Sequence, residues 1–119
     1  MVSPDETRDE AFGKQDRILS RQIFRRVYER GHKFRAEYFT AFVLTNSEQR
    51  SRVGITATRK TGNSVKRNRS RRLAREVFRK NKWRVPPGVD IVINVKSSMA
   101  EACYAEIEKD FIQFLERSK

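Results

Sequence analysis

Hydrophobic residues recur at helical spacing in three stretches of the chain, residues 18–30, 64–81 and 102–118. Ser20 is the expected N-cap of the first helix and Gly31 its expected end. The remaining face of this first helix is rich in arginine. The residues expected on the apolar faces of the three helices are Leu19, Ile23, Phe24, Val27 and Tyr28, then Leu73, Ala74, Val77 and Phe78, then Tyr104, Ile107, Phe111, Phe114 and Leu115.

Four other stretches have strand-like patterns, residues 32–37, 38–44, 52–60 and 89–95. Residues 89–95 are the most apolar and are expected at the centre of the sheet. Residues 52–60 alternate between a core face and a second face of small and hydroxylated residues. That second face is expected to lie under water or under a phosphate backbone. The core face holds Val53, Ile55 and Ala57, and the second face holds Gly54, Thr56 and Thr58.

These elements follow one another in the order αβββαβα, which predicts an α+β fold. A length of 119 residues suits a single domain. Residues 1–13 are acidic and poor in large apolar side chains, so we expect a flexible tail there. The domain is therefore expected to span residues 14–119.

Positive charge is concentrated between residues 59 and 84, which hold twelve Lys or Arg and one acid, Glu76. This stretch supplies +11 of the net charge of +12. Asn63 or Ser64 can cap the helix that begins there. Like charges three or four residues apart on a helix repel by a few tenths of a kcal/mol per pair. A polyanionic partner would offset that cost, which favours nucleic-acid binding over a merely solvated face.

Other classes of function lack the residues they need. One cysteine, Cys103, excludes an internal disulfide and a multi-cysteine zinc site, and one histidine, His32, disfavours a catalytic triad. Cys103 is expected to pack beside the last helix. No clustered carboxylates indicate a protein-borne metal site. No apolar run is long enough for a membrane span, and the acidic start is unlike a secretory signal, so we expect a cytoplasmic protein.

The stretch GNSVKRNRSRRLAREVFR, residues 62–79, resembles the arginine-rich signature of bacterial ribonuclease P protein subunits. Three more blocks are similar to that family in the same order, RILSRQIFRRVYERGHKF, RVGITATRK and DIVINVK. The resemblance covers most of the chain. It implies a two-layer α/β sandwich like domain 2 of ribosomal protein S5, with a left-handed βαβ crossover. Most crossovers are right-handed, so physical rules alone would predict the opposite hand.

The resemblance also implies a function. Family members are the small subunit of a ribonucleoprotein whose RNA removes the 5′ leader of precursor tRNA by metal-assisted hydrolysis. The protein then has no catalytic residue of its own, and Mg²⁺ is held mainly by the RNA. The expected partners are the catalytic RNA subunit and precursor tRNA, with no membrane and no DNA.

The residues that match the family's RNA-contacting motif and its flanks are Arg59, Lys60, Asn63, Lys66, Arg67, Asn68, Arg69, Arg71, Arg72 and Arg75. The residues that match its cleft for the leader, between the first helix and the sheet, are Phe24, Tyr28, Phe42, Thr56 and Thr58. The chain departs from the familiar pattern at Tyr28, where a phenylalanine is more usual, and at Thr61, which is often aliphatic.

Simpler interpretations remain open from the sequence. By spacing alone, Phe24 and Tyr28 would pack in the core, and Asn63 would cap a helix. A structural RNA-binding protein of the ribosomal or chaperone type would use the same basic helix without any role in cleavage. The aromatic and threonine cleft is the feature that favours a substrate site.

Overall fold

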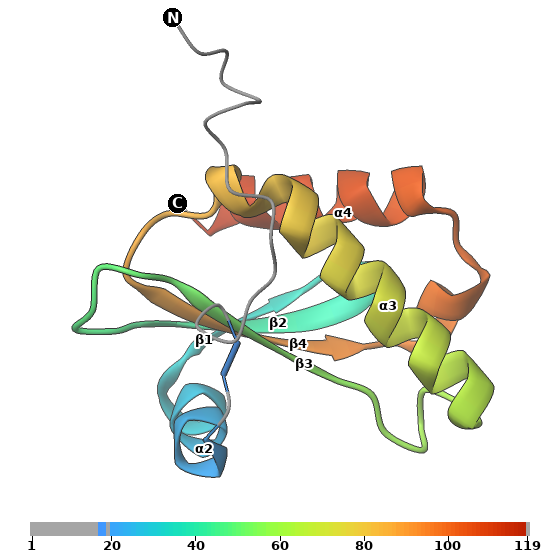
Figure 1. The fold of residues 1–119 in the computed structure, drawn as a ribbon, viewed down its shortest axis with the longest axis horizontal. Coiled ribbons are helices and arrows are strands. Elements are labelled where there is room, and N and C mark those ends of the chain that lie inside the picture. The colour runs from blue at the N-terminus through green and yellow to red at the C-terminus, as the bar shows by residue number, and fades with distance from the viewer. Residues whose placement is uncertain (1–16, 19, 119) are drawn as a thin grey trace, which may run out of the picture.

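The computed structural model describes residues 17–18 and 20–118, so the predictions for the tail and for Leu19 lie outside it. A four-stranded sheet carries two helices on one face and one on the other (Figure 1). This is the predicted α+β class. The elements are α2 (Arg21–Arg30), β1 (His32–Arg35), β2 (Phe39–Thr45), β3 (Arg52–Thr56), α3 (Ser64–Asn81), β4 (Val89–Val95) and α4 (Tyr104–Arg117), with short 3₁₀ helices η2 (Lys82–Arg84) and η3 (Ser97–Glu101).

β4 lies inside the sheet, as its apolar sequence predicts. The strand order is β1-β2-β4-β3, and β4 pairs antiparallel with β2 and parallel with β3. The parallel pair makes β3, α3 and β4 a crossover unit. Its handedness and the likeness to ribosomal protein S5 stay predictions. In this register Asn94 lies between two threonines, Thr40 on β2 and Thr56 on β3.

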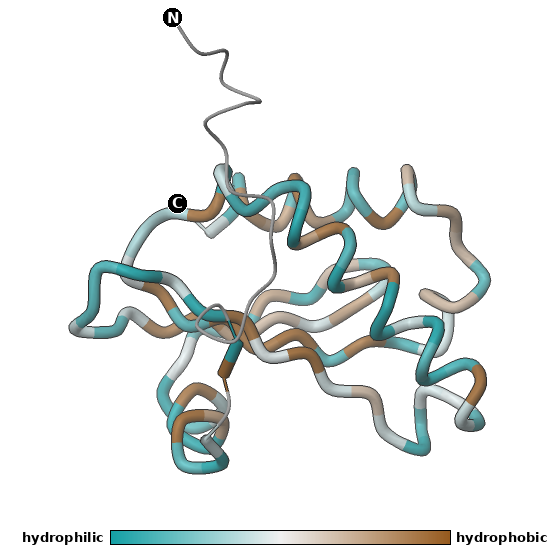
Figure 2. The backbone as a smooth tube through the Cα atoms, viewed as in Figure 1, coloured by the Kyte–Doolittle hydropathy of each residue, from teal (hydrophilic) through white to brown (hydrophobic). Residues whose placement is uncertain are grey.

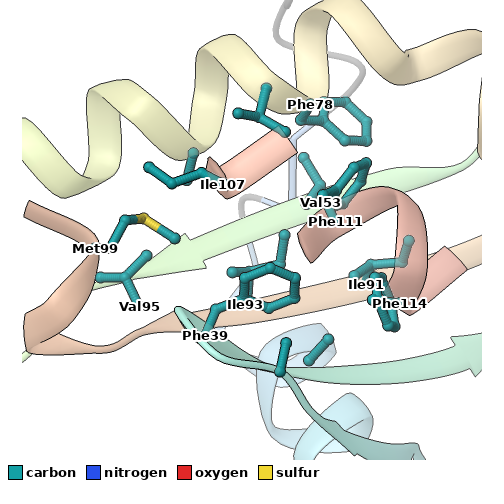
Figure 3. Packing of buried hydrophobic residues seen from close by; sticks show 14 of the residues in the cluster. Phe39, Val53, Phe78, Ile91, Ile93, Val95, Met99, Ile107, Phe111 and Phe114 are labelled. Carbon is teal, nitrogen blue, oxygen red and sulfur yellow. The ribbon is translucent and has the colours of Figure 1, made fainter. Parts of the chain in front are cut away.

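The main core lies between the sheet and the helices α3 and α4 (Figure 3). The rings of Phe39 on β2 and Phe114 on α4 meet edge to face, with centroids 5.8 Å apart. Phe78 of α3 is 1% exposed. Burying a side chain of this size contributes about 1.5–3 kcal/mol. The predicted apolar faces of both helices are confirmed, with Leu73 and Tyr104 partly buried at their margins.

The opposite face of the sheet is covered by α2, and only in part. Val27 of α2 packs with Ile18 and with Val92 of β4 in a second, smaller cluster. α2 has ten residues and is therefore about 15 Å long. The two-layer description applies to the sheet with α3 and α4, and α2 adds a partial layer on the other face (Figure 1).

An ion pair joins the starts of β3 and β4. The guanidinium of Arg52 donates two hydrogen bonds to the Asp90 carboxylate, at 2.9 and 2.8 Å. The side-chain amide of Asn46 donates a third, at 2.9 Å. The Asp90 side chain is only 6% exposed, so these donors compensate for the water it loses. Hydrogen bonding to Asp90 raises the pKa of Arg52.

The first helix begins at Arg21, as the predicted N-cap at Ser20 requires, although the stretch of helical spacing starts at Ile18. Ile18 is not helical, because its backbone N–H donates to the carbonyl of Val53 at 3.0 Å. This pairing extends the sheet edge and holds the segment in an extended conformation. Ser20 caps the helix and Gly31 follows its end, as predicted.

The packed position predicted for Cys103 is wrong, because the side chain is exposed. Cys103 is instead the N-cap of α4, and its backbone N–H donates to Glu106 Oε1 at 3.2 Å. Hydrogen bonds from Cys103, and then from the Tyr38 hydroxyl, lower the pKa of Glu106. The same contact with Glu106 raises the pKa of Tyr38 to about 12.

Candidate nucleic-acid interface

Asn63 begins the basic helix. Its Oδ1 atom accepts a hydrogen bond from the backbone N–H of Lys66 at 3.0 Å, which satisfies one of the unpaired donors at the start of α3. The predicted cap is therefore confirmed. The amide oxygen of Asn63 is engaged within the fold, so only its NH₂ group remains for the RNA contact that the resemblance implies.

One side of α3 presents cations to solvent, and hydrophilic residues dominate this helix in Figure 2. Its one acid, Glu76, is paired with Arg79 three residues on. Hydrogen bonding to Arg79 lowers the pKa of Glu76, which keeps that carboxylate charged. Of the predicted RNA-contact residues on α3, Lys66, Asn68, Arg69, Arg72 and Arg75 are exposed, and Arg67 and Arg71 are half-buried.

A hollow of about 560 Å³ lies along this side of α3. Two of its cations, Arg17 and Arg79, were not among the predicted contact residues. Helical periodicity places Arg79 on the same third of the helix as Asn68, Arg71, Arg72 and Arg75, but Arg79 was not among the positions that the resemblance assigned to RNA contact. Arg17 comes from another segment, which a bridge to Val53 brings beside β3. The residues around the hollow are Arg17, Asn68, Arg71, Arg72, Arg75, Glu76 and Arg79.

Arg71 has a structural role in addition to any role in binding. Its Nη2 atom donates to the carbonyl oxygen of Ala57 at 3.3 Å, and its Nη1 atom lies 3.5 Å from Asn68 Oδ1. The side chain thus ties α3 to the segment that follows β3. Arg72 and Arg75 are exposed, so they are cleaner positions at which to test binding.

The second candidate surface is the part of the sheet beside α2. Phe24 of α2 lies directly on Gly54 of β3, where an added Cβ would be only 2.4 Å from the ring atom Cζ. Phe24 is half-buried and packs against the small cluster around Val92. The Phe24 ring therefore forms one side of this surface, and packing against the small cluster buries most of the ring.

Tyr28 lies at the rim of that surface and is 37% exposed. Its hydroxyl lies 3.3 Å from Thr56 Oγ1 and donates to Asn94 Oδ1. Its ring meets Phe42 edge to face, with centroids 4.9 Å apart. Four of the five predicted cleft residues, Phe24 included, are thus brought together on the α2 side of the sheet.

A groove of about 840 Å³ continues from this point across the ends of β3 and β4. It links the threonines of the predicted leader cleft, Thr58 included, to two residues of the predicted RNA-contact set, Arg59 and Lys60. Sequence reasoning missed Asn94. The sequence did contain a signal for this residue, because Asn94 is a polar side chain within the apolar run of β4. The groove is lined by Thr40, Thr56, Thr58, Arg59, Lys60, Asn94, Val95, Lys96, Ser97 and Ser98.

The donors in and around these surfaces are hydroxyls, amides and cations. Within residues 17–18 and 20–118, no three His, Cys, Asp or Glu side chains come together as metal ligands. This part of the chain therefore does not fit a metal ion. No helix there is both long and apolar enough to cross a bilayer. These hydroxyls, amides and cations can bind a phosphate backbone and unstacked bases.

Comparison with known proteins identifies the family. A family model described as Ribonuclease P matches residues 12–119. The chain belongs to the ribonuclease P protein family. The ribonuclease P protein component of Natranaerobius thermophilus is 38% identical over 96 residues, which cover 81% of this chain and 84% of that protein. The component of Syntrophus aciditrophicus is 40% identical over 94 residues, 79% of each chain.

Solved structures of the ribonuclease P family share the fold. The protein from Thermotoga maritima is 30% identical and superposes with a TM-score of 0.76, covering 85% of this chain and 96% of that one. The protein from Staphylococcus aureus is 27% identical with a TM-score of 0.77, covering 87% and 95%. The resemblance identified in the arginine-rich stretch is confirmed.

Proposed function

We propose that this chain is the protein subunit of a bacterial ribonuclease P. It binds the catalytic RNA through α3 and the 5′ leader of precursor tRNA through the groove beside Tyr28. The RNA removes the leader to give the mature 5′ end, and the protein supplies binding and positioning. Family membership supports the subunit role. The protein is expected to act in the cytoplasm, where precursor tRNA is made.

The basic side of α3 suits a folded RNA. Arginine donates paired hydrogen bonds to phosphate oxygens and keeps its charge at any physiological pH. The major groove of an RNA helix is too narrow for side chains to read bases, so backbone and shape are what this surface would recognise. Arg69, Arg72 and Arg75 are exposed and available for such contacts.

The groove suits a single strand. Tyr28 offers an exposed ring on which a base can stack, and Thr56 and Asn94 offer hydroxyl and amide groups within reach of it. Arg59 and Lys60 lie at the far end of the same groove and can pair with phosphates. Mg²⁺ would be held mainly by the RNA, where it supplies the metal assistance to hydrolysis.

The observation that carries this proposal is the continuity of the groove. One groove joins Thr56 and Asn94, which contact the Tyr28 hydroxyl, to Arg59 and Lys60, which lead into α3. A protein that binds only folded RNA needs the basic helix and has no use for this second surface. A subunit that holds substrate against its own RNA needs both, side by side.

The test is cleavage of a precursor tRNA by a bacterial ribonuclease P RNA at low Mg²⁺, with and without this protein. We expect efficient cleavage at the mature 5′ end only when both components are present. Arg72→Ala/Arg75→Ala should lose this stimulation, and Lys109→Ala on α4 is the matched control. RNA binding without any effect on cleavage would favour the structural RNA-binding alternative.

A further inference from the structure

Charge outside the basic helix is separated in space. Residues 21–35, in α2 and β1, hold six Lys or Arg and one acid, Glu29. Residues 101–116, in η3 and α4, hold five acids and one Lys. α2 and α4 lie on opposite faces of the sheet (Figure 1). The nearly neutral remainder of the chain therefore contains a distinctly positive surface on α2.

The outer face of α2 consists of Arg21, Arg25, Arg26 and Arg30, all exposed. No ion pair joins these arginines to an acid of the described part of the chain. The pairs 21 with 25 and 26 with 30 are four residues apart, so each destabilises the helix by a few tenths of a kcal/mol. Residues 22, 25, 26, 29 and 30 surround a shallow hollow of about 160 Å³.

This face adjoins the proposed leader groove. Arg25 and Arg21 precede Tyr28 by three and seven residues, so they follow one side of the helix for about 10 Å from that ring. Lys33 adds a cation 5.9 Å from the centre of the Phe42 ring, on the same side of the sheet. A strand that stacks on Tyr28 would meet this line of cations as it leaves the groove.

We propose that the outer face of α2 binds backbone phosphates of the 5′ leader, upstream of the nucleotides that occupy the groove. This inference rests on the proposed function and names a further segment of the same substrate. A shallow row of arginines suits an extended single strand, because backbone contacts need no shaped cavity and read no sequence. The contact should therefore act on leaders of any sequence that are long enough to reach it.

The experiment uses the holoenzyme, assembled from the catalytic RNA and either wild-type protein or Arg25→Gln/Arg26→Gln. Dissociation constants are measured for mature tRNA, for a precursor with a leader of a few nucleotides, and for one with a leader several times longer. Lys109→Gln/Arg117→Gln on α4 removes the same charge and is the control. Glutamine is a good helix former, so α2 should persist, which circular dichroism can check.

We expect the α2 variant to bind the long-leader precursor about five- to tenfold more weakly. The dependence of log K on log salt for that ligand should become shallower by about 1.4, the value for two phosphates of a single strand. Binding of the short-leader precursor and of mature tRNA should be unchanged. The control variant should match wild type for all three ligands.

Two results would overturn the inference while the proposed function stands. One is unchanged binding of the long leader by the α2 variant. The other is equal loss for all three ligands, which would assign these arginines to the catalytic RNA or to the tRNA body. If the wild-type holoenzyme binds mature tRNA as well as either precursor, the leader groove itself fails and the inference fails with it.

Discussion

Tyr28 gives the most direct test of the groove, because its ring and its hydroxyl have separate partners. The ring meets Phe42 and keeps 37% of the residue's surface exposed. The hydroxyl contacts Thr56 and Asn94. Tyr28→Phe removes only the hydroxyl, and Tyr28→Ala removes the ring as well. Comparing the two changes separates base stacking from the hydrogen bonds beneath it.

The two substitutions should differ in the size of their effect on precursor binding. Stacking of one base on an aromatic side chain is worth about 1–3 kcal/mol, so Tyr28→Ala should weaken precursor binding about 5- to 150-fold. Tyr28→Phe keeps the stacking surface. It removes a partly exposed hydroxyl whose two partners can still bond to each other, so precursor affinity should fall about threefold or less.

The assay is equilibrium binding of precursor and mature tRNA to the holoenzyme, at one salt concentration and with Ca²⁺ in place of Mg²⁺ to slow cleavage. The ratio of the affinity for precursor tRNA to the affinity for mature tRNA measures the contribution of the leader to binding. Thermal unfolding of the free protein checks whether loss of the contact with Phe42 in Tyr28→Ala has disturbed the fold.

An equal loss for precursor and mature tRNA in Tyr28→Ala would refute the stacking argument. So would a loss in Tyr28→Phe as large as the loss in Tyr28→Ala. The second result would mean that the hydroxyl, and hence the hydrogen bonds to Thr56 and Asn94, carries the interaction.

Three further predictions concern other parts of the molecule. Arg75→Ala should weaken binding to the catalytic RNA and reduce its salt slope by about one, while Lys109→Ala leaves both unchanged, as filter binding over a salt series would reveal. Asp90→Asn should lower the free energy of unfolding in urea by about 2 kcal/mol, because it breaks a largely buried ion pair, and an unchanged midpoint would contradict that role. The hydrogen bonds from Cys103 lower the pKa of Glu106, so its contribution to stability is present above the usual value of 4.5 and lost as the pH falls below it. Glu106→Gln should therefore lose less stability than wild type on acidification, measured as Tm against pH.

Much of the fold follows from local patterns in the sequence. Helical spacing predicted the buried faces of α3 and α4, and the apolar run of β4 predicted its interior position. Ile18 belongs to the stretch of helical spacing but is not helical, because it forms a hydrogen bond with Val53, which lies 35 residues further along the chain. Such a pairing overrides local helix propensity and leaves no mark in the periodicity. Cys103 was misplaced because periodicity cannot distinguish a cap from a packed position one residue outside the helix.

The candidate site was less accessible to sequence reasoning, because it depends on which strands become neighbours. Thr40 and Thr56 are 16 residues apart in the chain, yet both lie opposite Asn94. That register, and the parallel pairing of β3 with β4 in particular, cannot be read from alternation within one strand. The resemblance to ribonuclease P proteins supplied the cleft residues, and it omitted Asn94 because it was carried over only at matching motif positions.

The short length of α2 explains why a cleft exists at this face at all. α2 buries Val92 and the surface over Gly54 and ends at Arg30, and toward the threonines it extends the Tyr28 side chain, which contacts Thr56 and stays partly exposed. A longer helix, or a larger residue at position 54, would cover the remaining sheet or lift Phe24 away from it. Gly54→Ala should therefore alter the groove more than the main core. The added methyl group would clash with the Phe24 ring, and such overpacking costs about 1–3 kcal/mol. We expect precursor affinity to fall while affinity for the catalytic RNA, bound through α3, stays the same. Loss of both together would mean that the change at Gly54 disturbs the main core as well as the groove.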